Sequence, residues 1–287
     1  LTLDGRLDTR GGWLAAQLAA PAGMPALLDA TLRLPPLPAA PDAPLAGTLD
    51  ARLPDLGLFE PWIAQVSNLA GRAAARLEIG GTLAAPRLLG EAGVQDLRAG
   101  VPALGITLRE GQAKVQADGG NTLRLSASVR SGDGTLHLDG DASRSPDGAR
   151  VGLRLHGDRV QVLDTTALQA QATPDIAVAW RDGQIAVTGT IAVPQARIHA
   201  QDQPAAVRSS PDVVVLGREA PGRTPLAAEA DLRVELGDDV RVDAYGFTGR
   251  LGGAVRLSQR GDGSGGVTGT VRVDEGQYVF YGQRLPV

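Results

Sequence analysis

The fold is decided by Leu226-Ala-Ala-Glu-Ala-Asp-Leu-Arg-Val-Glu-Leu236, a stretch with a period of two. Its even positions carry only Leu, Val and Ala, whereas four of its five odd positions carry Glu, Asp or Arg. Successive side chains of a β-strand point to opposite faces of the sheet. The stretch therefore predicts a strand with one apolar face and one charged face.

The same alternation recurs along the chain. Asp118-Gly119, Asp133-Gly134 and the run Gly261–Gly266 separate the alternating segments, and such turn signals every 10–15 residues or so are typical of antiparallel hairpins. We expect about twenty strands, all with one apolar face. The residues predicted to line this apolar face are Leu123, Leu125, Leu136, Leu138, Leu153, Leu155, Ile185, Val187, Ile191, Leu232, Val234, Val240, Val242, Leu251, Val255, Leu257, Val271 and Val273.

One segment, residues 56–68, predicts a helix, because Leu58, Trp62 and Val66 recur at helical spacing and Pro61 stands near its start. We found no clear domain boundary elsewhere. The chain is therefore predicted to be a single continuous β-domain over residues 1–287, a piece of a longer protein, with this helix as the one candidate for a sub-boundary.

The predicted apolar face poses a geometric problem, because apart from residues 56–68 the sequence predicts no helix that could cover it. A two-sheet sandwich or a closed barrel would bury the face, and so would a long curved antiparallel sheet folded into an open trough. An ordinary core between two sheets explains the alternation as well as a trough does. Aromatic residues make up only 3% of the chain, so the face is built from Leu, Val, Ile and Ala. Such a surface suits ligands with flexible chains better than ligands with flat rings, which need aromatic stacking partners.

Composition and motifs argue against several other functions. A net charge of −4 argues against nucleic acid as a partner, and the absence of cysteine excludes thiolate catalysis, disulfides and cysteine zinc sites. The run Gly261–Gly266 matches GxGxxG, but predicted strands lie on both sides, so we interpret it as a hairpin loop. His137, His156 and His199 fall on polar faces without metal-ligand spacing. We expect no cofactor, no metal and no enzymatic activity.

Several motifs, in order, resemble the C-terminal region of the TamB family. Each motif is weak alone, but their order and spacing make the match specific, and the likeness covers most of the chain. One departure is Phe247, where the family usually carries Leu. The motifs are Gly80-Gly-Thr-Leu-Ala-Ala-Pro-Arg-Leu-Leu-Gly90, Val101-Pro-Ala-Leu-Gly-Ile106, Ser210-Pro-Asp-Val-Val-Val215, Leu236-Gly-Asp-Asp-Val-Arg-Val242, Tyr245-Gly-Phe-Thr-Gly-Arg-Leu251 and Val273-Asp-Glu-Gly-Gln-Tyr-Val-Phe-Tyr-Gly-Gln-Arg-Leu285.

The resemblance implies a fold and a location. TamB-like proteins belong with AsmA-like and bridge-like lipid transfer proteins, whose sheet forms an open hydrophobic trough called a β-taco. The family implies the periplasm of a Gram-negative bacterium and an inner-membrane anchor in an N-terminal segment absent from this chain. It also implies an outer-membrane barrel, TamA, as a partner that would be met through a missing C-terminal part.

The resemblance also implies a function. The first hypothesis is a bridge whose groove carries phospholipid acyl chains toward the outer membrane. The alternative is an assembly factor for outer-membrane β-barrel and autotransporter proteins, which would bind nascent chains at a partner edge around Tyr278, Phe280 and Tyr281. A purely structural β-spacer is the third hypothesis.

Overall fold

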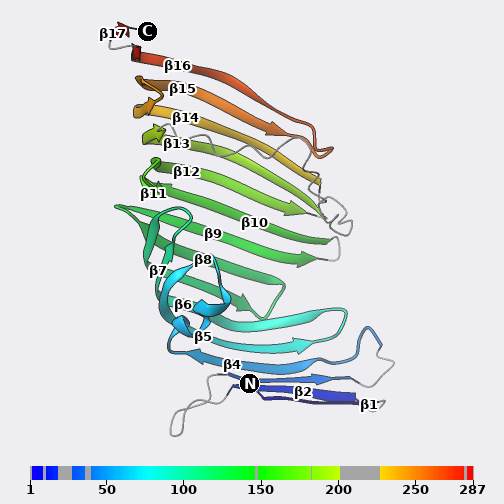
Figure 1. Cartoon of the computed structure of the whole chain (residues 1–287). Coiled ribbons are helices and arrows are strands. Elements are labelled where there is room, and N and C mark those ends of the chain that lie inside the picture. The colour runs from blue at the N-terminus through cyan, green and yellow to red at the C-terminus, as the bar shows by residue number, and fades with distance from the viewer. Residues whose placement is uncertain are drawn as a thin grey trace, which may run out of the picture. The chain divides into compact units, whose positions relative to one another are not determined.

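The structure, a computed structural model, describes residues 2–8, 11–18, 28–35, 40–145, 148–181, 183–200, 227–280 and 283–286. These residues form seventeen strands and one short helix (Figure 1). They divide into two compact units, residues 1–160 and residues 161–287. The prediction of one continuous trough over residues 1–287 stays a prediction, and we describe each unit by itself.

Unit 1 is an antiparallel meander in which each strand pairs with the next one along the chain. Short turns such as the one at Asp133 make these pairings local in sequence. Its elements are β1 (Thr2–Asp8), β2 (Gly11–Leu18), β3 (Leu28–Leu34), β4 (Ala46–Leu53), the helix η1 (Leu56–Trp62), β5 (Ser67–Gly81), β6 (Pro86–Val101), β7 (Ile106–Asp118), β8 (Thr122–Ser131), β9 (Gly134–Ser145) and β10 (Gly148–Asp158).

Unit 2 follows the same plan with one exception. Strands β13 and β14 pair in parallel, whereas β12 with β13 and each later pair from β14 to β17 are antiparallel. The residues that connect β13 to β14, 201–226, lie outside the described residues. The elements are β11 (Val160–Asp164), β12 (Leu168–Arg181), β13 (Gln184–Ala200), β14 (Ala227–Ala244), β15 (Phe247–Gln259), β16 (Gly265–Phe280) and β17 (Gln283–Pro286).

The predicted fold class is confirmed. Each unit is an open, bowed, mainly antiparallel sheet that is not closed into a barrel (Figure 1). The run Gly261–Gly266 lies in the β15–β16 hairpin, where Arg260 N–H donates to the Ser264 carbonyl at 2.7 Å. The hairpin interpretation of this glycine run is therefore confirmed as well. Seventeen strands are described, fewer than the twenty or so predicted.

The predicted helix is shorter than expected and of a different kind. It is a 3₁₀ turn that ends at Trp62, and the residues up to 68 that we assigned to it include the start of β5. Asp55 caps its first turn by accepting the N–H of Gly57 at 2.8 Å. Leu58 and Trp62 are 55% and 77% exposed, so their spacing does not mark a buried helical stripe. Short 3₁₀ pieces are typical of connectors between strands.

The helix η1 also protects the edge of a strand. Strand β4 pairs with β5 only from Ala73 onward, which leaves the first residues of β5 without a strand on that side. The Glu60 carboxylate fills the gap by accepting the N–H of Leu69 at 2.8 Å. A side chain thus replaces a missing strand partner, which is one way that proteins cover an exposed sheet edge.

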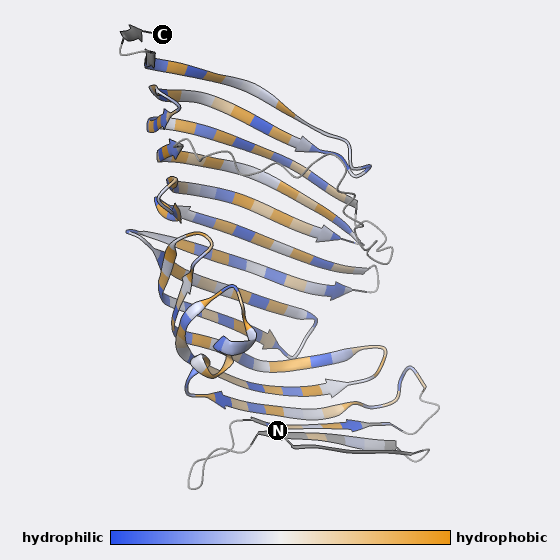
Figure 2. Cartoon of the chain, viewed as in Figure 1, coloured by the Kyte–Doolittle hydropathy of each residue, from blue (hydrophilic) through white to orange (hydrophobic). Residues whose placement is uncertain are grey.

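The strand register assembles one apolar face in each unit. In unit 1, Leu49 stands opposite Leu77, which stands opposite Gly90, and the row continues across neighbouring strands. In unit 2, Val187 stands opposite Ala230, and Val234 opposite Val255. Figure 2 shows the underlying alternation as orange and blue bands along the strands. We call this side of each sheet the apolar face and the other side the polar face.

Each sheet bends along a row of β-bulges on adjacent strands, and we call each row a bend line. A bulge adds one residue to one strand of a pair and bends that strand. The bend line of unit 1 comprises residues 67–72 of β5, 94–99 of β6, 108–112 of β7 and 128–130 of β8. The bend line of unit 2 comprises residues 171–173 of β12, 193–195 of β13, 236–241 of β14, 248–250 of β15 and 274–277 of β16.

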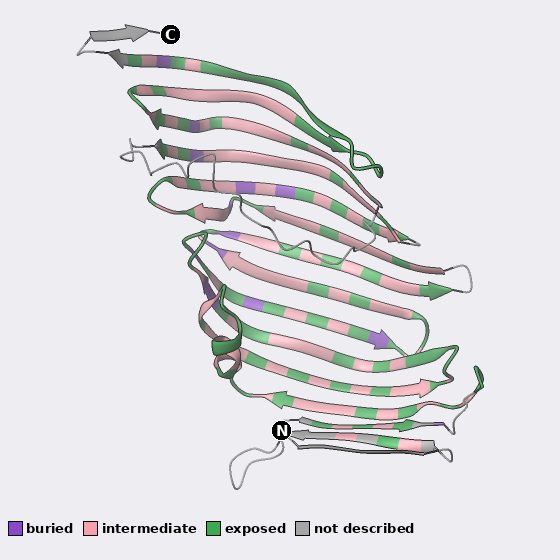
Figure 3. Ribbon diagram, turned by 45° about the vertical axis from the view of Figure 1, so that its right-hand side comes forward, coloured by how far each residue is buried: buried purple, intermediate pink, exposed green. Residues whose placement is uncertain are grey.

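Burial is concentrated at the bend lines, as the few purple segments of Figure 3 illustrate. Seven apolar side chains are buried among the described residues, and five of them lie in a bend line or within two residues of one. These five belong to the apolar face, where side chains crowd together on the inside of a bend. The apolar face is therefore the inner side of each bend. The five residues are Ala99, Ile106, Ala172, Ala196 and Val240.

A pair of glycines in the β5–β6 hairpin tests this register. Gly90 has a φ of +127°, and a Cβ there would lie 2.1 Å from the Arg76 carbonyl oxygen, whereas a Cβ on Gly80 would meet nothing within 4 Å. We expect Gly90→Ala to lower the free energy of unfolding by roughly 2–4 kcal/mol. Gly80→Ala is the matched control and should change it by less than about 1 kcal/mol. Equal urea midpoints for the two variants would contradict the register.

Candidate functional site

The apolar face is the candidate site, because no second layer covers it within either unit. Among the described residues of each unit, strands pack against their hydrogen-bonded neighbours, and η1 packs against β5. No helix or second sheet in the described part of a unit lies across the apolar face. A sandwich core is therefore absent from each unit as described, and the sheet keeps a broad apolar surface on one side.

The register places all eighteen predicted lining residues on the apolar face. Leu123 and Leu125 of β8 join the row through Ala142 and Gly140 of β9. Leu138 joins it directly through Leu155. Unit 2 has a row of its own, which runs through Ile185, Val187 and Ile191 of β13, Leu232, Val234, Val240 and Val242 of β14, Leu251, Val255 and Leu257 of β15, and Val271 and Val273 of β16.

Their exposure divides these residues into three groups. Fourteen are half-buried, as expected on a sheet face that neighbouring side chains cover only partly. Leu257, Val271 and Val273 are 37%, 51% and 44% exposed. Val240 is only 2% exposed, so it packs inside the bend and offers no surface to a ligand. Contact between the other seventeen and a ligand stays a prediction.

Sequence reasoning missed further residues of the same face. Val115 stands opposite Leu125, Val178 opposite Val187, and Trp180 opposite Ile185. The signal on β12 was weak, because Ile176-Ala-Val-Ala-Trp180 has apolar side chains at every position, which hides the period of two. The additional members on β7 and β12 are Val115, Ile176, Val178 and Trp180.

The polar face carries exposed ion pairs between adjacent strands. Arg76 lies 3.1 Å from Asp50, and Lys114 lies 2.9 Å from Glu91. In unit 2 the Arg256 guanidinium donates to both Asp231 carboxylate oxygens, at 2.6 and 2.5 Å. Exposed pairs of this kind add little to stability, but they keep the face hydrated. Each sheet therefore has one charged, hydrated face and one apolar face.

The bidentate pair has a consequence for titration. The hydrogen bond from Arg256 lowers the pKa of the Asp231 carboxyl below its ordinary value, with a further contribution from the charge of Arg256. Because the folded pKa is depressed, the pair stabilises the fold above the unfolded pKa. That contribution is lost as the pH falls through the folded pKa.

We expect Arg256→Met to return the pKa of Asp231 toward its ordinary value, measured by carboxyl-carbon NMR titration. Arg233→Met is the matched control, since Arg233 stands opposite Arg256 but binds Glu235 at 2.6 Å. The control should move the pKa of Asp231 by less. An equal shift in both variants would assign the effect to net charge rather than to the hydrogen bond.

Two histidines that are distant in the sequence lie side by side in the structure. His137 and His156 stand opposite each other on β9 and β10, and their rings stack with centroids 5.2 Å apart. His156 Nδ1 lies 4.0 Å from Asp139, and His199 Nδ1 lies 3.9 Å from Asp243. Within the described ranges, no cluster of three or more potential ligands is placed to hold a metal ion.

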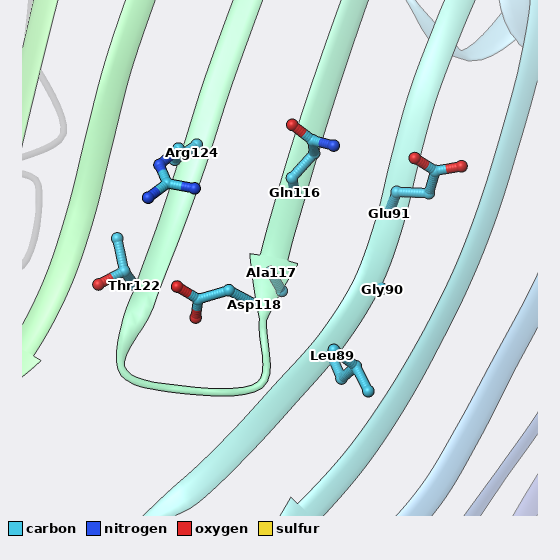
Figure 4. A pocket seen from close by; sticks show the side chains of 8 residues that line it. All are labelled: Leu89, Gly90, Glu91, Gln116, Ala117, Asp118, Thr122 and Arg124. Atoms are coloured by element: carbon cyan, nitrogen blue, oxygen red, sulfur yellow. The ribbon is translucent and has the colours of Figure 1, made fainter.

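A depression lies on the polar face of unit 1, opposite the predicted groove (Figure 4). Side chains of three neighbouring strands line it, and only Leu89 among them is large and apolar. Its charged members are exposed to water, so it resembles a gap between surface side chains rather than a binding cavity. The lining comprises Leu89, Gly90 and Glu91 of β6, Gln116, Ala117 and Asp118 of β7, and Thr122 and Arg124 of β8.

The predicted partner edge lies at the end of β16. Strand β17 pairs with Gln277–Phe280, so Tyr278 has paired strands on both sides, whereas the printed partner of Phe280 is Gln283 of β17. The part of β16 with no strand on its outer side, among the described residues, is 265–276. Tyr278 is 36% exposed, whereas Tyr281 and the side chain of Phe280 lie outside the described residues.

Comparison with known proteins identifies the family. A family model named TamB C-terminal domain matches residues 123–287, more than half of the chain. The chain belongs to the TamB family. It is also 25% identical over 256 residues to the translocation and assembly module subunit TamB of Haemophilus influenzae. The resemblance inferred from the sequence motifs is therefore confirmed.

The TamB relative is much longer than this chain. The alignment covers 84% of the chain but only 20% of the relative, so the chain spans about a fifth of that protein. No solved structure matches the chain. Among the described residues, no helix has the length and apolarity needed to cross a bilayer.

Proposed function

We propose that this TamB segment is part of a periplasmic bridge between the inner and outer membranes, and that its apolar faces hold phospholipid acyl chains. The observation that carries the proposal is the uncovered apolar face of each unit. Leu, Val, Ile and Ala build this face, and no second layer lies on it within a unit in the described residues. The TamA partner and the direction toward the outer membrane rest on family membership alone.

The chemistry of the face fits an acyl chain. Each CH₂ group moved from water onto an apolar surface contributes roughly 0.8 kcal/mol. The face repeats similar aliphatic side chains from strand to strand, so an acyl chain would meet similar contacts at each step. Among the eighteen predicted lining residues, all Leu, Val or Ile, none has a polar group that would hold one position strongly. Such a surface favours movement along the sheet, while head groups remain in water near the rim.

Charges on the face test this proposal. Leu232 and Val255 lie on adjacent strands of unit 2, and both are half-buried. We expect the Leu232→Asp, Val255→Asp variant to lose most co-purified phospholipid, measured by native mass spectrometry and lipid extraction after detergent-free purification. The reason is that a carboxylate beside an acyl chain is desolvated without a partner.

The control places two carboxylates on the other side of the same sheet. Thr268 and Thr270 of β16 are exposed and alternate with the apolar-face residues. Thr268→Asp, Thr270→Asp should retain lipid. Circular dichroism must report the parent fold for both variants. Full lipid occupancy in the first variant, or a parent chain without lipid, would contradict the proposal.

A second candidate function is strand assembly, and the free edge of β16 supports it. Residues 265–276 present backbone groups with no strand on their outer side in the described part of the chain. Val267 is 67% exposed, and Val271 and Val273 are also accessible. An extended segment of a nascent outer-membrane protein could add to such an edge by backbone hydrogen bonding.

Site-specific photo-crosslinking tests the edge. A photoreactive residue at Thr270 of the edge strand should crosslink to a synthetic alternating β-strand peptide from an outer-membrane barrel. The same residue at Thr188 is the control, because Thr188 is exposed but lies in β13, between two paired strands. Similar crosslinking at both positions, or none at Thr270, would argue against strand addition.

A further inference from the structure

Three bulges of the two bend lines share an unusual residue choice, whereas the β5 bulge has Asn68 as its left-handed residue. Asp96, Glu110 and Glu275 all have left-handed backbones, with φ of 54°, 52° and 60°. Each lies in the segment of β6, β7 or β16 that carries the extra residue of a bulge. Glycine is the residue best suited to such a position, because a side chain there strains the backbone. An acidic side chain at all three positions indicates that the carboxylate itself has a role.

Each of these carboxylates binds an arginine of the adjacent strand. Asp96 of β6 pairs with Arg72 of β5. Glu110 of β7 pairs with Arg130 of β8 at 3.4 Å, and Glu275 of β16 pairs with Arg250 of β15 at 3.0 Å. The pairs therefore link neighbouring strands at the point where each sheet bends.

The three pairs lie on the outer side of the bend. The carboxylates of Asp96, Glu110 and Glu275 are 68%, 65% and 76% exposed. The buried side chains of the same bend lines, such as Ala99 and Val240, belong to the apolar face. A bulge can shift along a strand pair when nothing fixes its register. An ion pair from the bulged residue to the next strand opposes that shift, and so fixes where and how sharply the sheet turns.

We propose that these acid–arginine pairs are clasps that set the bend of each sheet and thereby the opening of its apolar face. Loosening a clasp lets the bulge relax and the strand straighten, which widens the apolar face. The inference concerns the sheet itself, so it holds whatever molecule occupies that face. It also explains why Asp96, Glu110 and Glu275 stand at left-handed positions that glycine would suit better.

Because the chain has no cysteine, spin labels can be attached only at cysteines that are introduced, and the bend can be measured directly. Spin labels at Thr107→Cys and Gln116→Cys would sit on exposed positions of β7 on either side of its bulge. Asp96→Asn and Glu110→Gln remove the clasp charges while keeping side-chain size. We expect the mean inter-label distance, measured by pulsed electron paramagnetic resonance, to lengthen and broaden. The inter-label distance should approach roughly 30 Å, the separation of positions 107 and 116 in a straight strand.

Asp50→Asn is the matched control in the same labelled chain. It removes the Asp50–Arg76 pair, which lies on β4 and β5 outside the bend line. This variant should leave the distance unchanged. No change in the clasp variant, or an equal change in the control, overturns the proposal.

A second measurement covers the case in which the clasp variant does not fold. Exposed ion pairs are screened by salt, with a Debye length of about 3 Å at 1 M. Raising the salt concentration on the labelled parent chain should lengthen the same distance reversibly while circular dichroism stays constant. A distance that is insensitive to salt in the parent chain overturns the proposal.

Discussion

The structure depends on the register of backbone pairing from one strand to the next. Successive side chains of a strand point to opposite faces. A register shift of one residue would therefore move every apolar-face Leu and Val of that strand to the polar face. The pairing of Leu138 with Leu155, and of Val234 with Val255, keeps the apolar row continuous within each unit. Because no second layer packs on that row within a unit of the described chain, the ladder itself is the main source of order, and the few buried side chains gather at the bends.

The β-bulges bend the sheets that the strand register builds. In each unit they line up on adjacent strands, so small local insertions add to one bend with the apolar side inside. Two motifs behind the family resemblance, Leu236–Val242 and Val273–Leu285, contain bulges of this kind. The same feature thus relates the recognisable sequence pattern to the geometry of the proposed lipid surface. The exposed pairs of Asp96, Glu110 and Glu275 stand where that geometry would be adjusted.

The two proposed functions, lipid holding and strand addition, depend on different parts of the molecule. The first depends on side chains of the apolar face, and the second on backbone groups along residues 265–276 of β16. A chain of the TamB family could therefore perform one function without the other. Variants such as Leu232→Asp change side-chain polarity and leave the edge backbone intact. The two functions are separable by mutation for that physical reason.

The sequence by itself determined the strand class, the two faces and the family, because a period of two and a set of ordered motifs are local properties of the chain. It also assigned the eighteen predicted lining residues to the apolar side of their strands, since alternation separates the two sides of a strand. Tertiary structure decided the rest. The parallel pairing of β13 with β14, the stacking of His137 on His156 and the burial of Val240 depend on which strands become neighbours. The helix was shorter than its spacing suggested because the first residues of β5 pair with β6 instead. The bend lines were invisible in the sequence, because a bulge exists only relative to the strand beside it.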